Sequence, residues 1–204
     1  KMRHLIWGIL FFGFVANAQQ WTAINHVNNG KKAIVFNSEQ ISDFIYTEIS
    51  ELAENKAYVA QGELYAYIDT GCQELSPYIF AEANNFNSGY AIVGDSFNLG
   101  VINVKMQIVT PLAFAQVRLP KLGLIVVQTH DGTWGAMDTL GNKRLPFIHN
   151  LPPQIIDLEH IIVCKNDLYG VVNDCNDVVF NTAYQYISPK GLGYKSGKYL
   201  RLFN

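Results

Sequence analysis

A repeat with a period of 31 to 35 residues constrains this chain more than any other feature of its sequence. Six short segments align without gaps, and most of them join an aromatic or apolar residue to a small residue, two apolar residues and a final Asn or Asp. They are Ala33–Asn37, Tyr65–Asp69, Leu99–Asn103, Trp134–Asp138, Tyr169–Asn173 and Leu200–Asn204. Their starts are spaced by 32, 34, 35, 35 and 31 residues. A period held this closely is typical of a tandem repeat array.

Each segment follows a turn signal, and a second β-rich run precedes the turn. The turn signals are Asn29-Gly30, Gln61-Gly62, Gly94-Asp95-Ser96, Asp131-Gly132, Asn166-Asp167 and Ser196-Gly197. Gly, Asn and Asp supply the positive φ that tight hairpin turns need. The sequence therefore predicts a β-hairpin in each repeat, with the motif on its second arm. We expect the Asn or Asp at the end of the motif to bind the backbone two residues on and to start the next turn.

The motif strands are apolar at nearly every position, which indicates that both of their faces are buried in a stack. Gly100, Gly135 and Gly170 then have a physical reason, because a residue without Cβ lets the ring of a neighbouring repeat lie against the backbone. Ile34 and Arg201 occupy that position in the end copies, where atypical caps are expected.

A proline lies twelve residues beyond the first residue of three motifs, at Pro77, Pro111 and Pro146. Because proline cannot donate to a sheet ladder, it marks an edge or the entry to a connection. A third short segment follows in each repeat, as Ile45-Tyr46, Ile79-Phe80, Ala113-Phe114, Ile148-His149 and Ala183-Tyr184. These patterns predict an all-β fold, a tandem repeat of about five β-hairpin units that forms a solenoid-like curved stack. The alternative is a small β-propeller, although its blades usually contain four strands and about 40 residues or more.

The motif resembles the WG-repeat family of bacterial all-β repeats, which is named for the pair seen here as Trp134-Gly135. Tyr169-Gly170, Leu99-Gly100 and Tyr65-Ala66 are similar to degenerate copies of that pair. The resemblance covers residues 21 to 204. It implies hairpin repeats that are often exported and used for interaction, and it brings no catalytic residues.

The first residues are typical of a signal peptide. A basic start is followed by the apolar run Leu5–Val15 and by Ala16-Asn17-Ala18, the small-x-small pattern that signal peptidase reads. An apolar run of 11 residues is too short to span a bilayer, which takes about 20. The sequence thus predicts a cleaved signal peptide at residues 1–18, a single WG-type β-repeat domain at residues 19–204, no membrane span in the mature chain, and a periplasmic or extracellular location.

Charge and cysteine content narrow the function classes. The formal charge is −2, with 15 Lys and Arg against 17 Asp and Glu, so no overall field favours nucleic acid. The one basic cluster, Lys190, Lys195, Lys198 and Arg201, we interpret as a solvated edge. Cys164 should lie opposite about Tyr169 in a hairpin, with Cys175 too far along the strand to reach it. We therefore predict no intrachain disulfide among Cys72, Cys164 and Cys175.

No constellation in the sequence predicts catalysis, a metal or a cofactor. The histidines show no ligand spacing, and His130 is interpreted as a turn flank. His149 takes the place that Tyr46, Phe80, Phe114 and Tyr184 hold in other repeats, so we expect a packed ring. Asn173–Asp177 lacks the Gly and distal Glu of a calcium loop. A further set of aromatic residues is a candidate for a carbohydrate- or peptide-binding face: Tyr46, Tyr58, Tyr65, Tyr67, Tyr78, Phe80, Phe86, Tyr90, Tyr184, Tyr186, Tyr194 and Tyr199.

The function expected from these observations is that of a secreted or periplasmic binding module for a protein or a cell-envelope glycan. It is not expected to be an enzyme or to bind nucleic acid. A structural envelope component without a small ligand is the second hypothesis. An enzyme with a site at an irregular repeat, near His149 and Pro152-Pro153, is the third.

Overall fold

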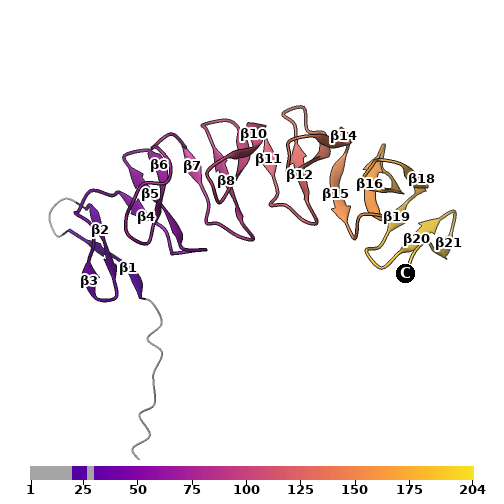
Figure 1. Cartoon of the computed structure of the whole chain (residues 1–204). Helices are drawn as coiled ribbons and strands as arrows, with labels where there is room; N and C mark the ends of the chain where they lie inside the picture. Colours follow the sequence, from indigo (N-terminus) through magenta and orange to yellow (C-terminus); the bar gives the residue numbers. More distant parts are fainter. Residues whose placement is uncertain (1–19, 27–29) are drawn as a thin grey trace, which may run out of the picture.

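The computed structural model describes residues 20–26 and 30–204, and these residues form six small antiparallel sheets without a helix. The predicted signal peptide lies outside the described residues. Figure 1 shows the sheets following one another in chain order along a curved row, with the first sheet and the last sheet far apart. The all-β repeat fold is confirmed, and the row is open.

Three of the sheets have three strands each. Sheet 1 contains β1 (Trp21–Asn25), β2 (Lys32–Phe36) and β3 (Glu39–Gln40), and sheet 2 contains β4 (Glu48–Ile49), β5 (Lys56–Gln61) and β6 (Leu64–Asp69). Sheet 6 contains β19 (Tyr186–Ile187), β20 (Leu192–Lys195) and β21 (Lys198–Arg201). In each of these sheets the predicted hairpin is present, as β1–β2, β5–β6 and β20–β21.

The three middle sheets have four strands each, in simple up-and-down order. Sheet 3 contains β7 (Glu82–Ala83), β8 (Tyr90–Gly94), β9 (Leu99–Asn103) and β10 (Ile108–Phe114). Sheet 4 contains β11 (Gln116–Val117), β12 (Leu124–Gln128), β13 (Trp134–Asp138) and β14 (Lys143–His149). Sheet 5 contains β15 (Leu151–Ile155), β16 (Ile161–Lys165), β17 (Leu168–Val172) and β18 (Val178–Tyr184).

The expected count of about five hairpin units with three segments each is therefore corrected to six sheets, of which three have four strands. The repeat spacing nevertheless accommodates four strands, contrary to the expectation from the usual blade length. It does so because a single residue, such as Ala115 or Asn150, separates the last strand of one sheet from the first strand of the next. In sheets 3, 4 and 5 the predicted third segment is the end of the fourth strand, as with Ala113-Phe114 in β10.

The fourth strands are bulged in one shared way. In sheet 4, Trp134 pairs with His149 and Ala136 pairs with Leu145. The chain therefore advances four residues along β14 where it advances only two along β13. The same register shift occurs between β9 and β10 in sheet 3 and between β17 and β18 in sheet 5. Pro111 and Pro146 lie in these bulged edge strands, as their missing N–H predicted.

The motif glycines lie under the bulges of their own sheet. A Cβ on Gly135 would be 2.2 Å from Cδ1 of Phe147 and 2.8 Å from the carbonyl oxygen of Leu145, both in β14. Cβ atoms on Gly100 and Gly170 would meet backbone atoms of β10 and β18 at 2.6 Å and 2.8 Å. The small residue was predicted correctly, but the contact expected from a neighbouring repeat comes instead from the bulged strand.

The strand register corrects the two end copies of the motif by one residue. In sheets 2 to 5 the first motif residue pairs with a residue near the end of the third segment, as in Tyr65 with Phe80. In sheet 1 the residue that pairs with Tyr46 is Lys32, so Ala33, rather than Ile34, holds the small position. In sheet 6 the pairing of Tyr194 with Tyr199 puts Leu200, rather than Arg201, at the glycine position.

Five hydrophobic cores join the six sheets, and each core draws on two successive sheets. Between sheets 4 and 5, for example, Trp134, Ala136 and Leu145 pack with Ile161 and Val163. The other cores lie between sheets 1 and 2, 2 and 3, 3 and 4, and 5 and 6. Both faces of each inner motif strand are thus buried, as its continuous apolar pattern predicted.

The Asn or Asp at the end of the motif forms the predicted turn in four sheets. Its Oδ1 accepts hydrogen bonds from the backbone N–H groups two and four residues on. For Asp138 these donors are Leu140 and Asn142, at 2.9 and 2.8 Å. Asp69, Asn103 and Asn173 accept the same pair of bonds. This side chain therefore closes the turn after the motif strand, which in sheets 3, 4 and 5 leads to the fourth strand.

Candidate functional site

A concave surface lies along the turns that follow the first strands of sheets 2 to 5. It has two parts. The larger part has a volume of about 510 Å³ and lies between sheets 2 and 3, and the other has a volume of about 380 Å³ and lies between sheets 4 and 5. Leu119 lines both parts. We call the two parts together the first-strand groove, because the turns that follow the first strands line both of them, together with residues of the adjacent strands.

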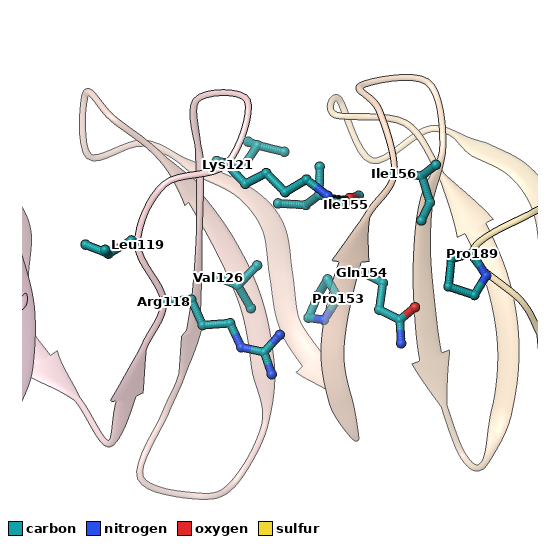
Figure 2. Close-up of a pocket in the computed structure, with 10 residues that line it drawn as sticks. Arg118, Leu119, Lys121, Val126, Pro153, Gln154, Ile155, Ile156 and Pro189 are labelled. Atoms are coloured by element: carbon teal, nitrogen blue, oxygen red, sulfur yellow. Dashed lines mark hydrogen bonds between the residues drawn. The ribbon is translucent and has the colours of Figure 1, made fainter. Parts of the chain in front are cut away.

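The part between sheets 4 and 5 combines apolar walls with two cations. It is lined by Arg118, Leu119, Lys121, Leu124, Val126, Pro153, Gln154, Ile155, Ile156 and Pro189. Figure 2 shows Arg118 on one wall and Gln154 on the other, with Pro153 between them. Lys121 spans the two sheets, since its Nζ donates a hydrogen bond to the carbonyl oxygen of Ile155.

Arg118 is exposed and is oriented by an aromatic ring. Its guanidinium carbon lies 5.5 Å from the centroid of the Trp134 ring. The motif Trp, itself buried with 6% exposure, thus contributes to the groove indirectly, by fixing a cation above its face. Arginine held in this way keeps its hydrogen-bond donors available for a ligand.

The part between sheets 2 and 3 combines apolar side chains with amides and a single carboxylate. Its lining includes Glu54 and the amides of Asn84, Asn85 and Asn87. Both carboxylate oxygens of Glu54 accept from the backbone N–H of Gly89, at 3.2 and 3.0 Å, and so tie sheet 2 to sheet 3. The two parts of the groove therefore offer amide and acid groups at one end and cations with prolines at the other.

His149, the centre of the predicted enzyme alternative, is a packed ring, as its place in the repeat predicted. It is 4% exposed, and neither of its ring nitrogens has a hydrogen-bond partner. Burial lowers its pKa and the charge of Lys165 lowers it further, while the backbone of Cys164 raises it. No carboxylate or hydroxyl bonds to this ring, so the geometry provides no catalytic pair there.

The other histidines have local roles. His130 contacts Oδ1 of Asn98 through Nε2 at 2.9 Å, beside the turn that it was predicted to flank. His160 contacts the Asp157 carboxylate at 3.0 Å and stacks on Phe203 with ring centroids 4.5 Å apart. Asn173–Asp177 forms the same Asx turn as Asp69, Asn103 and Asp138, and Arg144 of the preceding sheet binds the Asp174 carboxylate at 2.9 Å. Within residues 20–26 and 30–204, no group of three or more His, Cys, Asp or Glu side chains could hold a metal ion.

The candidate aromatic residues do not form one exposed face. Tyr46, Tyr67, Phe80 and Phe86 are buried, and six others are half-buried. Burial raises the pKa of Tyr46 to about 12, with smaller contributions from Tyr78, Cys72 and Glu74. Only Tyr186 and Tyr199 are exposed, at 50% and 67%, and both lie in sheet 6. The sequence repeat does not indicate the first-strand groove, because the residues that line it lie largely in irregular turn segments between the aligned motifs.

The cysteines agree with the predicted register. Cys164 pairs with Tyr169 across the β16–β17 hairpin, and all three cysteines, which lie among the described residues, are free. In the same part of the chain, no helix is long and apolar enough to cross a membrane.

Comparisons with known proteins agree with this architecture at the level of the repeat. A family model described as the WG containing repeat matches residues 65–94, which run from β6 of sheet 2 to β8 of sheet 3. The sequence repeat is therefore shifted by half a unit from the sheets. A search of curated proteins found no match.

Several solved structures superpose on the chain with low scores. Hsv2 from Kluyveromyces lactis is 13% identical with a TM-score of 0.42, and the alignment covers 92% of this chain and 74% of Hsv2. The computationally designed Ika4 protein is 19% identical with a TM-score of 0.36, over 62% of this chain and 91% of Ika4. The WD40 β-propeller domain of Doa1 is 12% identical with a TM-score of 0.36, over 79% and 64% of the two chains. These superpositions assign no function to the chain.

Proposed function

We propose that this protein is an exported binding module that holds an extended segment of a partner protein in the first-strand groove. The β-rich repeat architecture fits an interaction module in general terms, because an open row of sheets offers a long surface with many side chains in fixed places. The observation that carries the proposal is the groove itself, with its aliphatic and proline walls and its separated amide and cationic ends.

The composition of the groove favours a peptide over a glycan. Sugar-binding surfaces place exposed aromatic rings flat against the ligand, but the rings that line this groove are Tyr58, which is half-buried, and Phe86, which is buried. Extended peptides instead need apolar pockets for alternate side chains and polar groups for the backbone. A cell-envelope glycan is therefore the second candidate, and the same experiment includes it.

Export is part of this proposal and rests on residues 1–18, where a basic start, an apolar run and a small-x-small site follow one another. The proposal includes no catalytic step. The alternative, a purely structural role in the envelope, predicts that nothing binds in the groove.

Affinity capture with a groove variant tests the proposal. Residues 19–204 would be immobilised as wild type, as Leu119→Arg and as Leu140→Arg, and exposed to envelope extract and to a glycan array. Leu119 lines both parts of the groove, whereas Leu140 is 86% exposed in a turn of sheet 4 and serves as the control. We expect a protein that wild type and Leu140→Arg capture and that Leu119→Arg does not. Capture that is equal for all three, or absent from all three, would refute the proposed site.

A further inference from the structure

One position at the end of the first strand carries a polar residue in each of sheets 2 to 6. In four of these sheets its backbone N–H donates to the carbonyl oxygen of the same position in the second strand, as Arg118 does to Val126 at 2.9 Å. Gln154 pairs with Ile162 in the equivalent register. The five residues at this position are Ser50, Asn84, Arg118, Gln154 and Ser188. Arg118 is the only cation among the five.

In sheets 2, 3 and 6 the side chain at this position bonds to its own hairpin. Oγ of Ser50 accepts a hydrogen bond from the backbone N–H of Tyr58 at 2.9 Å. Oγ of Ser188 accepts from the backbone N–H of Leu192 at 3.0 Å. The side-chain amide of Asn84 donates to the carbonyl oxygen of its hairpin partner at 3.4 Å. These three side chains therefore serve their own sheet.

The side chains of Arg118 and Gln154 instead line the pocket between sheets 4 and 5. Figure 2 shows their polar ends on either side of Pro153. Both residues are exposed, and within residues 20–26 and 30–204 neither side chain has a hydrogen-bond partner. The guanidinium of Arg118 lies over the ring of Trp134. The two copies that differ from the rest of the row thus face each other across one pocket.

The charge of this pocket selects an anion. Its lining includes Arg118 and Lys121 and no Asp or Glu, and neither residue belongs to an ion pair in the described part of the chain. Lys121 already donates to the carbonyl oxygen of Ile155, so Arg118 is the cation with donors available. A guanidinium binds a carboxylate through two parallel N–H bonds, and the amide of Gln154 offers a further donor.

The apolar walls favour a carboxylate that is part of a peptide. Leu119 and Ile156 are half-buried, and Pro189 is exposed, so these three side chains present apolar surface to a ligand. An extended peptide directs every second side chain to the same side. An acidic residue with aliphatic residues two positions before and two positions after it therefore places one anion and two apolar groups against this pocket. A uronic acid has the carboxylate but no aliphatic side chains.

We propose that the pocket between sheets 4 and 5 binds the pattern aliphatic–x–acid–x–aliphatic in the partner's extended segment, with Arg118 and Gln154 donating to the acidic side chain. This inference rests on the proposed function and names the chemistry of the segment that the first-strand groove takes. It also gives a role to the cation that sheet 4 carries where the other four sheets are neutral.

Labelled synthetic peptides test this proposal by fluorescence anisotropy on residues 19–204. The probe is Thr-Val-Thr-Glu-Thr-Val-Thr with blocked ends, and its controls carry Gln or Lys in place of Glu. We expect saturable binding of the Glu peptide that weakens as salt rises, and binding of both controls that is weaker by about tenfold or more. Equal binding of the Gln peptide would overturn the role of the carboxylate.

Replacement of Arg118 by glutamine is the matched change in the protein, because sheet 5 carries glutamine at the same position and the fold accepts it there. Arg118→Gln should bind the Glu peptide about tenfold more weakly than wild type and the Gln peptide equally well. Arg118→Glu should prefer the Lys peptide. The control Lys105→Gln, which removes an exposed cation from a turn of sheet 3, should bind as wild type does. Wild-type affinity of Arg118→Gln for the Glu peptide would contradict the proposal.

The capture experiment separates failure of this inference from failure of the groove. If an envelope protein is captured by wild type and by Arg118→Gln but not by Leu119→Arg, the groove proposal holds and this inference is wrong. The inference is also wrong if no peptide binds. Binding of polygalacturonate that requires Arg118, without binding of the Glu peptide, would assign the pocket to a glycan carboxylate and overturn the peptide partner.

Discussion

Replacement of His149 by phenylalanine should stabilise the protein. The equivalent ring is Phe80 in sheet 2 and Phe114 in sheet 3, and both are buried. The imidazole of His149 has two buried nitrogens without a partner, and a buried polar group left unsatisfied costs about 1–3 kcal/mol. We expect His149→Phe to raise the free energy of unfolding by an amount in that range. For a chain of this length, that corresponds to about 2–4 °C of melting temperature for each kcal/mol.

The gain should grow in acid. Burial lowers the pKa of His149 in the folded state from its ordinary value of 6.5. The unfolded chain therefore binds the proton first, and the wild type loses stability as the pH falls below about 6.5 towards the folded pKa. A phenylalanine has no such loss, so the difference between the two proteins should be larger at pH 5.5 than at pH 7.5.

Urea unfolding followed by circular dichroism at both pH values measures these differences. The reciprocal variant Phe114→His is the matched control, and it should be destabilised and more sensitive to acid than the wild type. A His149→Phe protein that is less stable than wild type, or that exceeds it by the same amount at both pH values, would contradict the description of an unpaired buried imidazole.

Three further changes test the repeat. Gly135→Ala should destabilise by about 1–3 kcal/mol in thermal melts, because its Cβ would press on the bulge at Phe147; an unchanged melting temperature would argue against the bulge. Asp138→Ala should lose about 1–2 kcal/mol with its two turn hydrogen bonds, whereas Asp138→Asn should behave as wild type; equal losses would show that Oδ1 is not the important atom. A thiol reagent should modify exposed Cys175 in the folded protein and buried Cys164 only after unfolding, and fewer than three thiols in the unfolded, unreduced protein would reveal a disulfide.

Much of each repeat could be predicted from the sequence because its causes are local. Turn residues such as Asp131-Gly132 fix hairpins through their own backbone preferences, and the Asx at Asp138 closes its turn with atoms no more than four residues away. The apolar pattern of the motif strands, which marks burial on both faces, likewise depends only on neighbouring positions.

Features that depend on the pairing of distant strands could not be predicted from the sequence. The one-residue link at Ala115 leaves no gap in the β-rich pattern, so the last strand of one sheet and the first strand of the next were predicted as one segment. The first and last copies, which start at Lys32 and Tyr199, were misaligned by one residue because the first lacks the aromatic residue and the last lacks the glycine. The first-strand groove forms where turns of successive sheets lie next to each other, and the hydrophobic pattern of the sequence does not predict which turns become neighbours.

The open row of sheets is the central claim about this molecule, so its shape in solution is the most direct test. Small-angle X-ray scattering on residues 19–204 measures it. A compact domain of this length has a radius of gyration of about 16 Å. The curved open row in Figure 1 predicts a clearly larger radius and a distance distribution with a long tail. A radius near the compact value with a symmetric distribution would indicate a closed arrangement and would contradict the open row.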